Sequence, residues 1–162
     1  MDDLIAFNKP CGVICQFSEH EKHPCLKDYV DRPGFYPAGR LDTDSEGLLL
    51  MTDNGVLQAQ IADPKFKREK TYWAQVEGSP DEEKLDLLRN GMDLGGFVTR
   101  PAKVRLLEAG EADILWSRNP PVRMRKTVPD FWLEIRITEG KNRQVRRMTA
   151  KAGYPCLRLV RV

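Results

Sequence analysis

Apolar residues along this chain occur mostly in short runs that are bounded by glycine, proline, asparagine or aspartate. Short apolar runs, and runs in which apolar and polar residues alternate, are typical of β-strands. In one such run, Tyr72, Ala74 and Val76 share one side of an extended chain, and the residues between them share the other. The pattern predicts strands over residues 4–7, 12–15, 48–51, 71–76, 104–107, 114–116, 131–138 and 155–162.

Two short segments in the first half of the chain have helical spacing instead. Residues 26–30 place their apolar side chains on one side of a short helix. After the run at 48–51, either Asp53 or Asn54 can cap a second helix, which Pro64 ends. Both helices are short, so we expect strands to form most of the core.

The segment that starts at Ser79 has a clear helix-start signal. Ser79 can act as the N-cap, Pro80 suits the first helical position, and acidic residues follow in the opening turn. Gly91 is expected to end this helix. Its buried side is expected to contain Leu85, Leu87 and Leu88.

A last helix is expected between Asn142, as its N-cap, and Gly153, just beyond its end. Residues at the spacing of a core-facing stripe leave Arg143 and Arg147 pointing away and Arg146 on the flank. The arginines are therefore not needed to build the core and are available for binding. The core-facing residues are Val145, Met148, Thr149 and Ala152.

The order of these elements indicates the fold class. Strands mixed with a few scattered helices, without a regular βαβ alternation, predict an α+β protein with a mainly antiparallel sheet. The 162 residues fit one domain, or one domain with a small lobe. The N-terminus is acidic, and no apolar run has the length of a membrane span, so we expect a cytoplasmic protein that does not bind membranes.

The distribution of charge is more informative than its sum. The formal net charge is only +2, which by itself does not indicate nucleic-acid binding. Basic residues nevertheless crowd the last third of the chain, including a long proline-containing loop over residues 118–130, and such a cluster favours a phosphate-binding surface. These residues are Arg118, Arg123, Arg125, Lys126, Lys141, Arg143, Arg146, Arg147, Lys151, Arg158 and Arg161.

Two patterns imitate metal sites, and both fit poorly. The segment from Cys15 to Cys25 also contains His20 and His23, but these spacings match no standard zinc pattern, so reduced cysteines are the simpler interpretation. Residues 42–53 imitate the spacing of a calcium-binding loop. Leu50 stands there where a polar residue is usual. We therefore expect no metal ion. The four cysteines are Cys11, Cys15, Cys25 and Cys156.

The most informative stretch is residues 36–52, where a polar turn precedes the apolar run. Arg40 and Asp42 flank Leu41 in this turn, and Gly39 and Gly47 mark irregular backbone on either side. A carboxylate at the start of a buried strand, beside a guanidinium group that favours its ionised form, is a plausible reactive centre.

This stretch resembles the catalytic signature of the RNA pseudouridine synthases, in the branch that modifies bacterial ribosomal RNA. The signature is Gly39-Arg40-Leu41-Asp42 followed by Ser45, Gly47 and Leu48. Three further blocks are similar to family segments and occur in the same order, so the resemblance covers nearly the whole chain. They are Phe7-Asn8-Lys9-Pro10, Lys70-Thr71-Tyr72 and residues 139–148.

The resemblance implies a bent, mainly antiparallel sheet with a central catalytic cleft, a few flanking helices and no cofactor. It assigns Asp42 as the catalytic residue and Tyr72 as the side chain that stacks on the uracil. It pairs Arg146 with Asp42 and places Leu159 in the pocket wall. It implies that Arg40 holds the distorted RNA. Arg143, Gln144 and Arg147 are candidates for contacts to phosphates or bases at the mouth of the cleft.

Each of these residues also has a purely structural interpretation. An aspartate in a turn usually caps the backbone. Tyr72 on a strand and Leu159 in the last strand are each compatible with an ordinary place in the core. Arg146 is compatible with a solvent-facing position on a helix. These alternatives remain open from the sequence alone.

Two classes of function follow. The first is a pseudouridine synthase that flips a uridine out of structured ribosomal RNA, and the loop at Trp116-x-Arg118-Asn119-Pro120-Pro121 favours the members that act on 23S rRNA over those that act on the small subunit. The second is a non-catalytic module for rRNA binding or ribosome assembly. We expect residues 1–162 to form a monomeric catalytic domain without an N-terminal S4-type RNA-binding domain, and the final residues resemble a C-terminal truncation of the family pattern.

Overall fold

The structure is a computed structural model that describes residues 3–162. Within these residues it contains seven strands, three α-helices and three short 3-10 helices. All the strand pairs described below are antiparallel, which confirms the predicted α+β class with a mainly antiparallel sheet. The chain forms two compact units, one of residues up to Arg68 together with Arg161, and one of residues 69–160 together with Val162.

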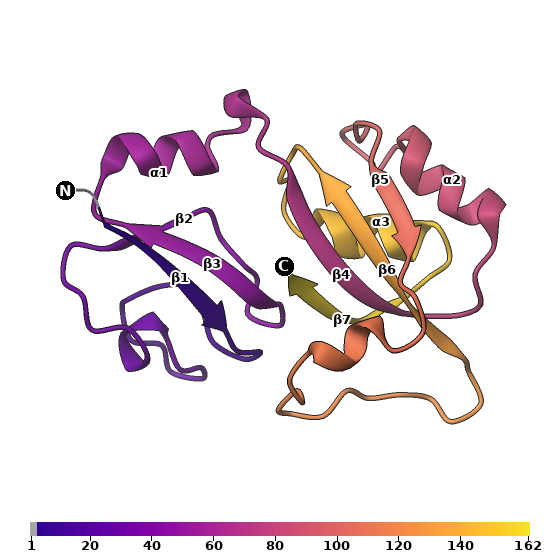
Figure 1. The fold of residues 1–162 in the computed structure, drawn as a ribbon, viewed down its shortest axis with the longest axis horizontal. Coiled ribbons are helices and arrows are strands. Elements are labelled where there is room, and N and C mark those ends of the chain that lie inside the picture. Colours follow the sequence, from indigo (N-terminus) through magenta and orange to yellow (C-terminus); the bar gives the residue numbers. More distant parts are fainter. Residues whose placement is uncertain (1–2) are drawn as a thin grey trace. The chain divides into compact units, whose positions relative to one another are not determined.

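The first unit is built around one central strand (Figure 1). This strand, β3, pairs along its length with β1 on one side, from Leu4 opposite Thr52 to Lys9 opposite Gly47, and with the short strand β2. The expected strands at 4–7 and 48–51 are therefore confirmed and extend further than predicted. The elements are β1 (Leu4–Lys9), β2 (Tyr36–Ala38), β3 (Glu46–Thr52) and α1 (Gly55–Ala62).

Helix α1 begins where the cap pattern indicates. The Asn54 side chain accepts hydrogen bonds from the backbone N–H groups of Val56 at 2.8 Å and Leu57 at 3.1 Å, which satisfies two donors that have no partner within the helix. Asn54, rather than Asp53, is therefore the cap. The expected helix at 26–30 is reduced to a single 3-10 turn, Leu26–Asp28.

One predicted strand of the first unit is wrong. Residues 12–15 form a single isolated bridge, between Ile14 and Cys25, instead of a strand. Gly12 adopts a left-handed conformation with φ of 92°, and the chain bends immediately after Lys9. The apolar side chains of Val13 and Cys15 are nevertheless buried, so their pattern reflects packing of an irregular segment.

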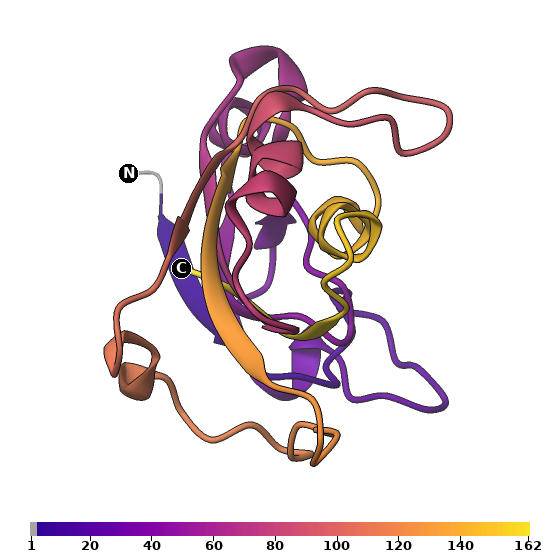
Figure 2. The same cartoon turned by 90° about the vertical axis from the view of Figure 1, so that its right-hand side faces the viewer.

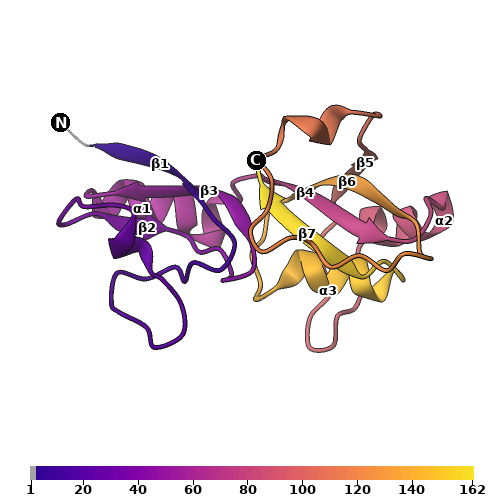
Figure 3. The ribbon, with the colours of Figure 1, turned by 90° about the horizontal axis from the view of Figure 1, so that it is seen from below.

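The second unit is a four-stranded sheet in the order β7-β4-β6-β5. Figure 2 and Figure 3 together show α2 and α3 on one face of this sheet and the 3-10 helix Glu111–Ile114, between β5 and β6, on the other. Residues 71 and 77 of β4 bond to residues 162 and 155 at opposite ends of β7, which makes that pair antiparallel. The elements are β4 (Lys70–Glu77), α2 (Glu82–Asn90), β5 (Lys103–Leu106), β6 (Asp130–Ile137), α3 (Gln144–Lys151) and β7 (Cys156–Arg161).

The core of the second unit lies between this sheet and the two helices. The predicted stripe of α3 is buried throughout, and each fully buried aliphatic side chain contributes roughly 1.5–3 kcal/mol relative to an exposed one. Tyr154 is also buried, and its hydroxyl donates to the Ser79 carbonyl at 3.0 Å. The cluster includes Ala74, Val76, Leu85, Leu88, Leu133, Ile135, Val145, Met148 and Leu159.

Three local predictions in the second unit are wrong. Residues 114–116 were expected to be a strand but are not: the segment Glu111–Ile114 is a 3-10 helix, and β5 pairs with β6. The N-cap of α2 is Asp81, whose carboxylate accepts from the Glu83 N–H at 2.9 Å, rather than Ser79. Leu87 is 50% exposed, and the buried leucines of α2 are Leu85 and Leu88 alone.

Among the described residues, no helix combines the length and the apolar composition that crossing a bilayer requires.

Candidate functional site

Asp42 lies in a tight turn between β2 and β3. Its carbonyl oxygen accepts the N–H of Ser45 at 3.0 Å, which closes the turn and confirms the geometry expected from the sequence. Leu41 and Ser45, on either side, are buried, whereas Asp42 itself is half-buried. The turn is therefore anchored at both ends while the acidic residue keeps partial access to solvent.

A second segment of the first unit fixes this turn from the other side. The carbonyl oxygen of Thr43, the residue after Asp42, accepts the N–H of Gly12 at 2.7 Å and the ammonium group of Lys9 at 3.3 Å. The thiol of Cys11 lies 3.7 Å from the Asp44 carbonyl oxygen. One backbone and two side-chain contacts from residues 9–12 thus hold the carbonyl groups of the two residues that follow the candidate catalytic carboxylate.

Lys9 is the centre of this arrangement. Its side chain is fully buried at the end of β1, and its ammonium group also donates to the carbonyl oxygens of Pro10 at 2.9 Å and Val13 at 2.8 Å. Burial lowers the pKa of Lys9 to about 8, although nearby thiols and carboxylates oppose the shift. Three carbonyl acceptors explain how a lysine can be tolerated in this position.

The structural roles of Lys9 and Gly12 were not predicted from the sequence. The block at residues 7–10 was recognised only as a family resemblance, and the strand was expected to end before Lys9. No periodic pattern distinguishes a buried lysine from an exposed one. The glycine at position 12 was the one available signal, because a left-handed residue next to a strand end often marks a close backbone approach.

The predicted site residues divide between the two units. Arg40 and Asp42 belong to the first unit, where Arg40 is exposed. The others belong to the second unit. Tyr72 is half-buried on β4, opposite Ile135 of β6, and packs against the core. Leu159 of β7 is a buried member of that core. The remaining three are Arg143, Gln144 and Arg146, at the start of α3.

The start of α3 has an unusual backbone. Arg143 occupies the N-cap with a left-handed φ of 52°, a conformation that non-glycine residues seldom adopt. Asn142 was expected to be the cap, so that prediction is wrong. Arg143 is exposed and Arg146 is half-buried, which confirms the predicted outward face and flank of the helix.

Gln144 was a candidate contact to phosphates or bases at the mouth of the cleft. Its side chain is buried, its amide oxygen accepts the Lys141 N–H at 3.1 Å, and its amide nitrogen lies 3.5 Å from the sulfur of Met148. The residue thus holds the segment that leads into α3. Its role as a substrate contact remains a prediction.

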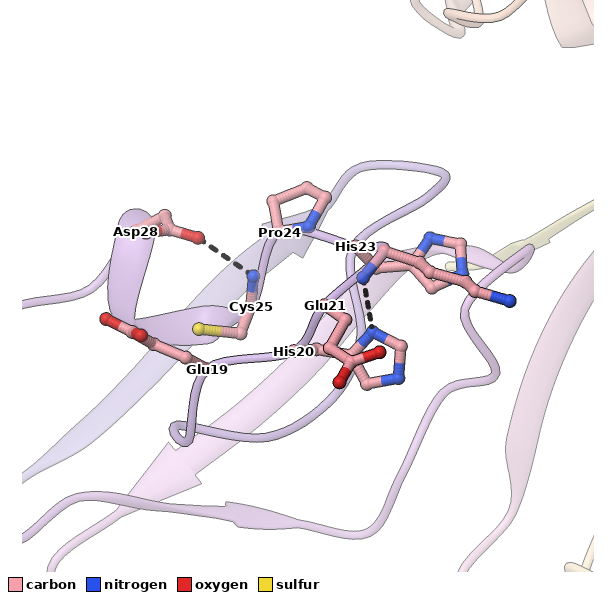
Figure 4. A pocket seen from close by; sticks show the side chains of 8 residues that line it. Glu19, His20, Glu21, His23, Pro24, Cys25 and Asp28 are labelled. Atoms are coloured by element: carbon pink, nitrogen blue, oxygen red, sulfur yellow. Dashed lines mark hydrogen bonds between the residues drawn. The ribbon is translucent and has the colours of Figure 1, made fainter.

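Three residues of the zinc-like pattern, His20, His23 and Cys25, line a pocket of the first unit. Figure 4 shows His20 and His23 in a loop whose pocket also contains Glu19, Glu21 and Asp28. The two imidazole rings stack with centroids 5.3 Å apart, and Nδ1 of His20 accepts the Lys22 N–H at 3.1 Å. Within residues 3–162, no group of three or more His, Cys, Asp and Glu side chains is placed to hold a metal ion.

The stretch that imitated a calcium loop has a different structure. Residues 46–52 form β3, and Glu46 is fully buried within this strand. A calcium-binding loop of that class needs its later ligands in a loop that leads into a helix. The described geometry therefore rejects the calcium interpretation.

The comparison with known proteins gives one consistent answer. The family model described as RNA pseudouridylate synthase matches residues 3–151. The chain belongs to this family. It is therefore an RNA pseudouridine synthase, which confirms the assignment made from the four sequence blocks.

This chain matches named relatives over nearly its whole length. It is 56% identical over 161 residues to the ribosomal large subunit pseudouridine synthase E of Xanthomonas axonopodis pv. citri, covering 98% of this chain and 84% of the relative. It is 51% identical over 158 residues to the protein of the same name from Vibrio parahaemolyticus, covering 98% of this chain and 65% of the relative.

Solved structures agree on the fold. A crystal structure titled as a pseudouridylate synthase matches with a TM-score of 0.79 at 28% identity, covering 99% of this chain and 62% of the other. Human RNA Pseudouridylate Synthase Domain Containing 1 matches with a TM-score of 0.61 at 17% identity, covering 95% of this chain and 63% of the other, which supports the fold alone.

Proposed function

We propose that this chain isomerises a specific uridine to pseudouridine in the 23S RNA of the large ribosomal subunit. The observation that carries the proposal is the identity of 56% and 57% to two proteins named ribosomal large subunit pseudouridine synthase E, across 98% of this chain. The loop at residues 116–121, which first favoured the large-subunit members, points in the same direction.

The reaction is an isomerisation and consumes no second substrate. The bond between N1 of uracil and C1′ of the ribose breaks, the base turns, and C5 forms a new bond to C1′. The proton on C5 is lost, and N1 gains one, so no atoms are added or removed overall. We propose Asp42 as the carboxylate that acts at the sugar, either as nucleophile or as base. The uridine has to leave its stack before a side chain reaches C1′.

The other roles follow from the family resemblance. Tyr72 is proposed to stack on the flipped uracil, and Leu159 to form part of the pocket wall. Arg146 is proposed to keep Asp42 ionised, because a nearby guanidinium favours the charged form of a carboxylate. Arg40, Arg143 and Gln144 are proposed to contact the RNA. The exposure of Arg40 and Arg143 supports a binding role for these two.

The contacts around Asp42 support catalysis more than a simple capping role. A catalytic carboxylate has to be held in a fixed direction, and the turn at residues 42–45 is fixed both by its own hydrogen bond and by Lys9 and Gly12. A module that only binds RNA needs positive charge, but it does not need hydrogen bonds that fix the turn around one acidic residue.

The cellular setting is also part of the proposal. Cys11, Cys15, Cys25 and Cys156 are all free thiols, which fits a reducing cytoplasm where ribosomes are assembled. We propose that the protein acts there as a monomer on rRNA, without a metal ion and without a membrane.

The experiment uses total rRNA from cells that lack the corresponding gene. Purified wild-type protein is incubated with this RNA, and pseudouridines are mapped in both subunits' RNA. The proposal expects one new pseudouridine in 23S RNA and none in 16S RNA. A new site in 16S RNA would favour a small-subunit enzyme, and no new site in free RNA or in assembling subunits would favour a non-catalytic module.

A further inference from the structure

Two cations of the second unit share a single aromatic ring. The ammonium nitrogen of Lys141 lies 5.8 Å from the ring centroid of Phe97, and the guanidinium carbon of Arg147 lies 5.6 Å from the same centroid. Lys141 precedes α3, Arg147 lies on the exposed side of α3, and Phe97 belongs to the loop between α2 and β5. Figure 2 shows this loop and α3 on the same side of the sheet.

The loop that carries Phe97 is an ordered arm, defined here as residues 92–99. Its two ends are tied by hydrogen bonds from Thr99 N–H to the Met92 carbonyl at 2.8 Å and from Met92 N–H to the Thr99 hydroxyl at 2.9 Å. Near its tip, Leu94 N–H donates to the Phe97 carbonyl at 3.0 Å. The arm therefore presents the ring in a defined place instead of as part of a loose loop.

The arm is also tied to α3. The Arg147 guanidinium donates to the Leu94 carbonyl oxygen at 2.7 Å. This bond and the ring contact restrict the arginine, so less side-chain entropy remains to be lost when it binds a ligand. Val98, beside the ring, is 67% exposed, so the arm does not bury its tip against the protein.

Neither cation is neutralised. Across the described range, no carboxylate forms an ion pair with Lys141 or Arg147. The nearby carboxylates are occupied by backbone: Asp93 accepts the Gly95 N–H at 2.8 Å, and both oxygens of Glu139 accept the Arg100 N–H at 3.1 Å.

On the opposite face of the same sheet, the arginines are paired with carboxylates. There, Arg105 binds Glu111 and Glu134, and Arg136 binds Glu134 and Glu69. Positive charge on that face is balanced by carboxylates, whereas the pair at Phe97 is held together without an anion. Two like charges around one ring repel each other, and an anionic ligand would relieve that repulsion.

We propose that Lys141, Arg147 and Phe97 form a phosphate clamp that binds one stretch of the RNA backbone. The inference rests on the proposed function, because RNA is the polyanion that this family modifies. Phosphodiester oxygens would accept hydrogen bonds from the ammonium and guanidinium groups, while the ring keeps the two cations in place. The sequence placed Arg147 among the candidate phosphate contacts and Lys141 in the basic cluster; the structure adds the shared ring and the arm.

The test measures binding of wild-type protein and of the double variant Lys141→Gln/Arg147→Gln to unmodified 23S RNA, at salt concentrations from about 50 to 200 mM. Removing two phosphate contacts should weaken binding about tenfold or more and reduce the slope of log affinity against log salt by about 1.5. Lys84→Gln is the matched control, because Lys84 is an exposed lysine of α2 whose ammonium also lies over an aromatic ring, that of Tyr154, and its loss should leave both unchanged.

Two further variants separate charge from folding. The swap Lys141→Arg/Arg147→Lys keeps both charges and should retain the salt slope. Phe97→Leu keeps both charges without the ring and should weaken binding about threefold with the slope retained. An unchanged affinity and salt slope in the glutamine double variant would overturn the clamp. A swap variant whose salt slope falls as much as that of the glutamine double variant would also overturn it.

A competition experiment distinguishes RNA from a free anion. Inorganic phosphate and chloride are compared at equal ionic strength for their ability to displace RNA. Displacement of RNA by phosphate beyond that by chloride, seen with the wild type and lost in the glutamine variant, supports a clamp that RNA occupies through its phosphates. Equal displacement by both salts also supports an RNA backbone site if inorganic phosphate alone does not bind. Phosphate that binds the wild type but not the glutamine variant, without displacing RNA more than chloride does, would instead assign a small-anion site and contradict the proposal. Because these are binding measurements, a wild type that forms no pseudouridine would refute the proposed function separately.

Discussion

The ammonium group of Lys9 donates a hydrogen bond to the carbonyl oxygen of Thr43 at 3.3 Å, directly beside the candidate catalytic residue Asp42. The same group bonds two carbonyl oxygens of its own segment, so a single buried lysine joins the end of β1 to the turn before β3. Lys9 is therefore a positioning residue, and it acts on the carboxylate only through the turn.

Replacing Lys9 with methionine tests this support. The methionine keeps most of the volume but leaves three buried carbonyl oxygens with fewer donors, which should lower the free energy of unfolding by about 1–3 kcal/mol. The turnover number for pseudouridine formation should fall, while RNA affinity should change little. Urea unfolding and single-turnover kinetics measure the two effects. Lys27→Met, at an exposed site of the same unit, is the control, and equal losses in both variants would contradict the role of Lys9.

The pH dependence of stability should report the buried ammonium directly. Burial lowers the pKa of Lys9 from 10.5 to about 8, so between these values the unfolded chain binds more protons than the folded one. The contribution of Lys9 to stability should therefore be constant below about pH 8 and rise from there to about pH 10. Subtracting the unfolding free energy of Lys9→Met from that of the wild type at each pH isolates this group. A difference that falls over this range would show a raised pKa instead.

Glu134 should make stability depend on pH in the acid range, with the same sign as Lys9. Burial of Glu134 tends to raise its pKa, but hydrogen bonds from Arg105, Arg136 and Trp73 outweigh this and lower it. A lowered pKa stabilises the folded state above the unfolded value near 4.5, and this stability is lost as pH falls towards the folded value. Glu134→Gln should lower the free energy of unfolding by about 1–3 kcal/mol at pH 7 and by less at pH 4. Urea unfolding at both values measures it, with the exposed Glu83→Gln as control; a cost that did not shrink in acid would be inconsistent with the lowered pKa.

A glycine at the base of the 92–99 arm makes a fourth prediction. Gly91 has φ of 90°, and an added Cβ would lie 2.6 Å from the Thr99 carbonyl oxygen. Gly95 has a similar φ of 79°, but an added Cβ would meet nothing within 4 Å. Gly95→Ala should therefore lower the free energy of unfolding only by the backbone strain, about 1–2 kcal/mol, and Gly91→Ala should lower it clearly more. Thermal or urea unfolding compares the two, and similar costs would show that the contact with Thr99 relaxes freely.

The sequence predicted the fold where the pattern of the segment itself determined the structure. The buried stripe of α3 and the alternation in β4 were sufficient, because burial on one side of a regular element sets its periodicity. The strand expected at 114–116 failed because β5 finds its partner, β6, far along the chain. The strand predicted at residues 12–15 is wrong because their apolar side chains are buried in an irregular segment that forms a single isolated bridge.

The candidate site was predictable only in part for a related reason. Asp42, Tyr72 and Arg146 were identified by resemblance to family motifs, and the turn at residues 42–45 has the geometry that its residues indicate. The contacts from Lys9 and Gly12, and the shared ring of Phe97, join segments that are distant in sequence, which no local pattern records. Gln144 shows that a sequence pattern does not report burial: this polar residue beside the arginines of α3 is buried, and its role as an RNA contact stays a prediction.

Catalysis is proposed to depend on the carboxylate of Asp42. Asp42→Asn keeps the size and the turn of this residue but removes its negative charge, and Asp44→Asn makes the same change two residues away. The measurement is the amount of pseudouridine formed in 23S RNA by each variant at saturating enzyme, with RNA affinity determined in parallel. If Asp42 is the catalytic carboxylate, Asp42→Asn forms no detectable product at near wild-type affinity, and Asp44→Asn forms clear product. Pseudouridine formed by Asp42→Asn at a rate close to the wild type would contradict the catalytic role of Asp42.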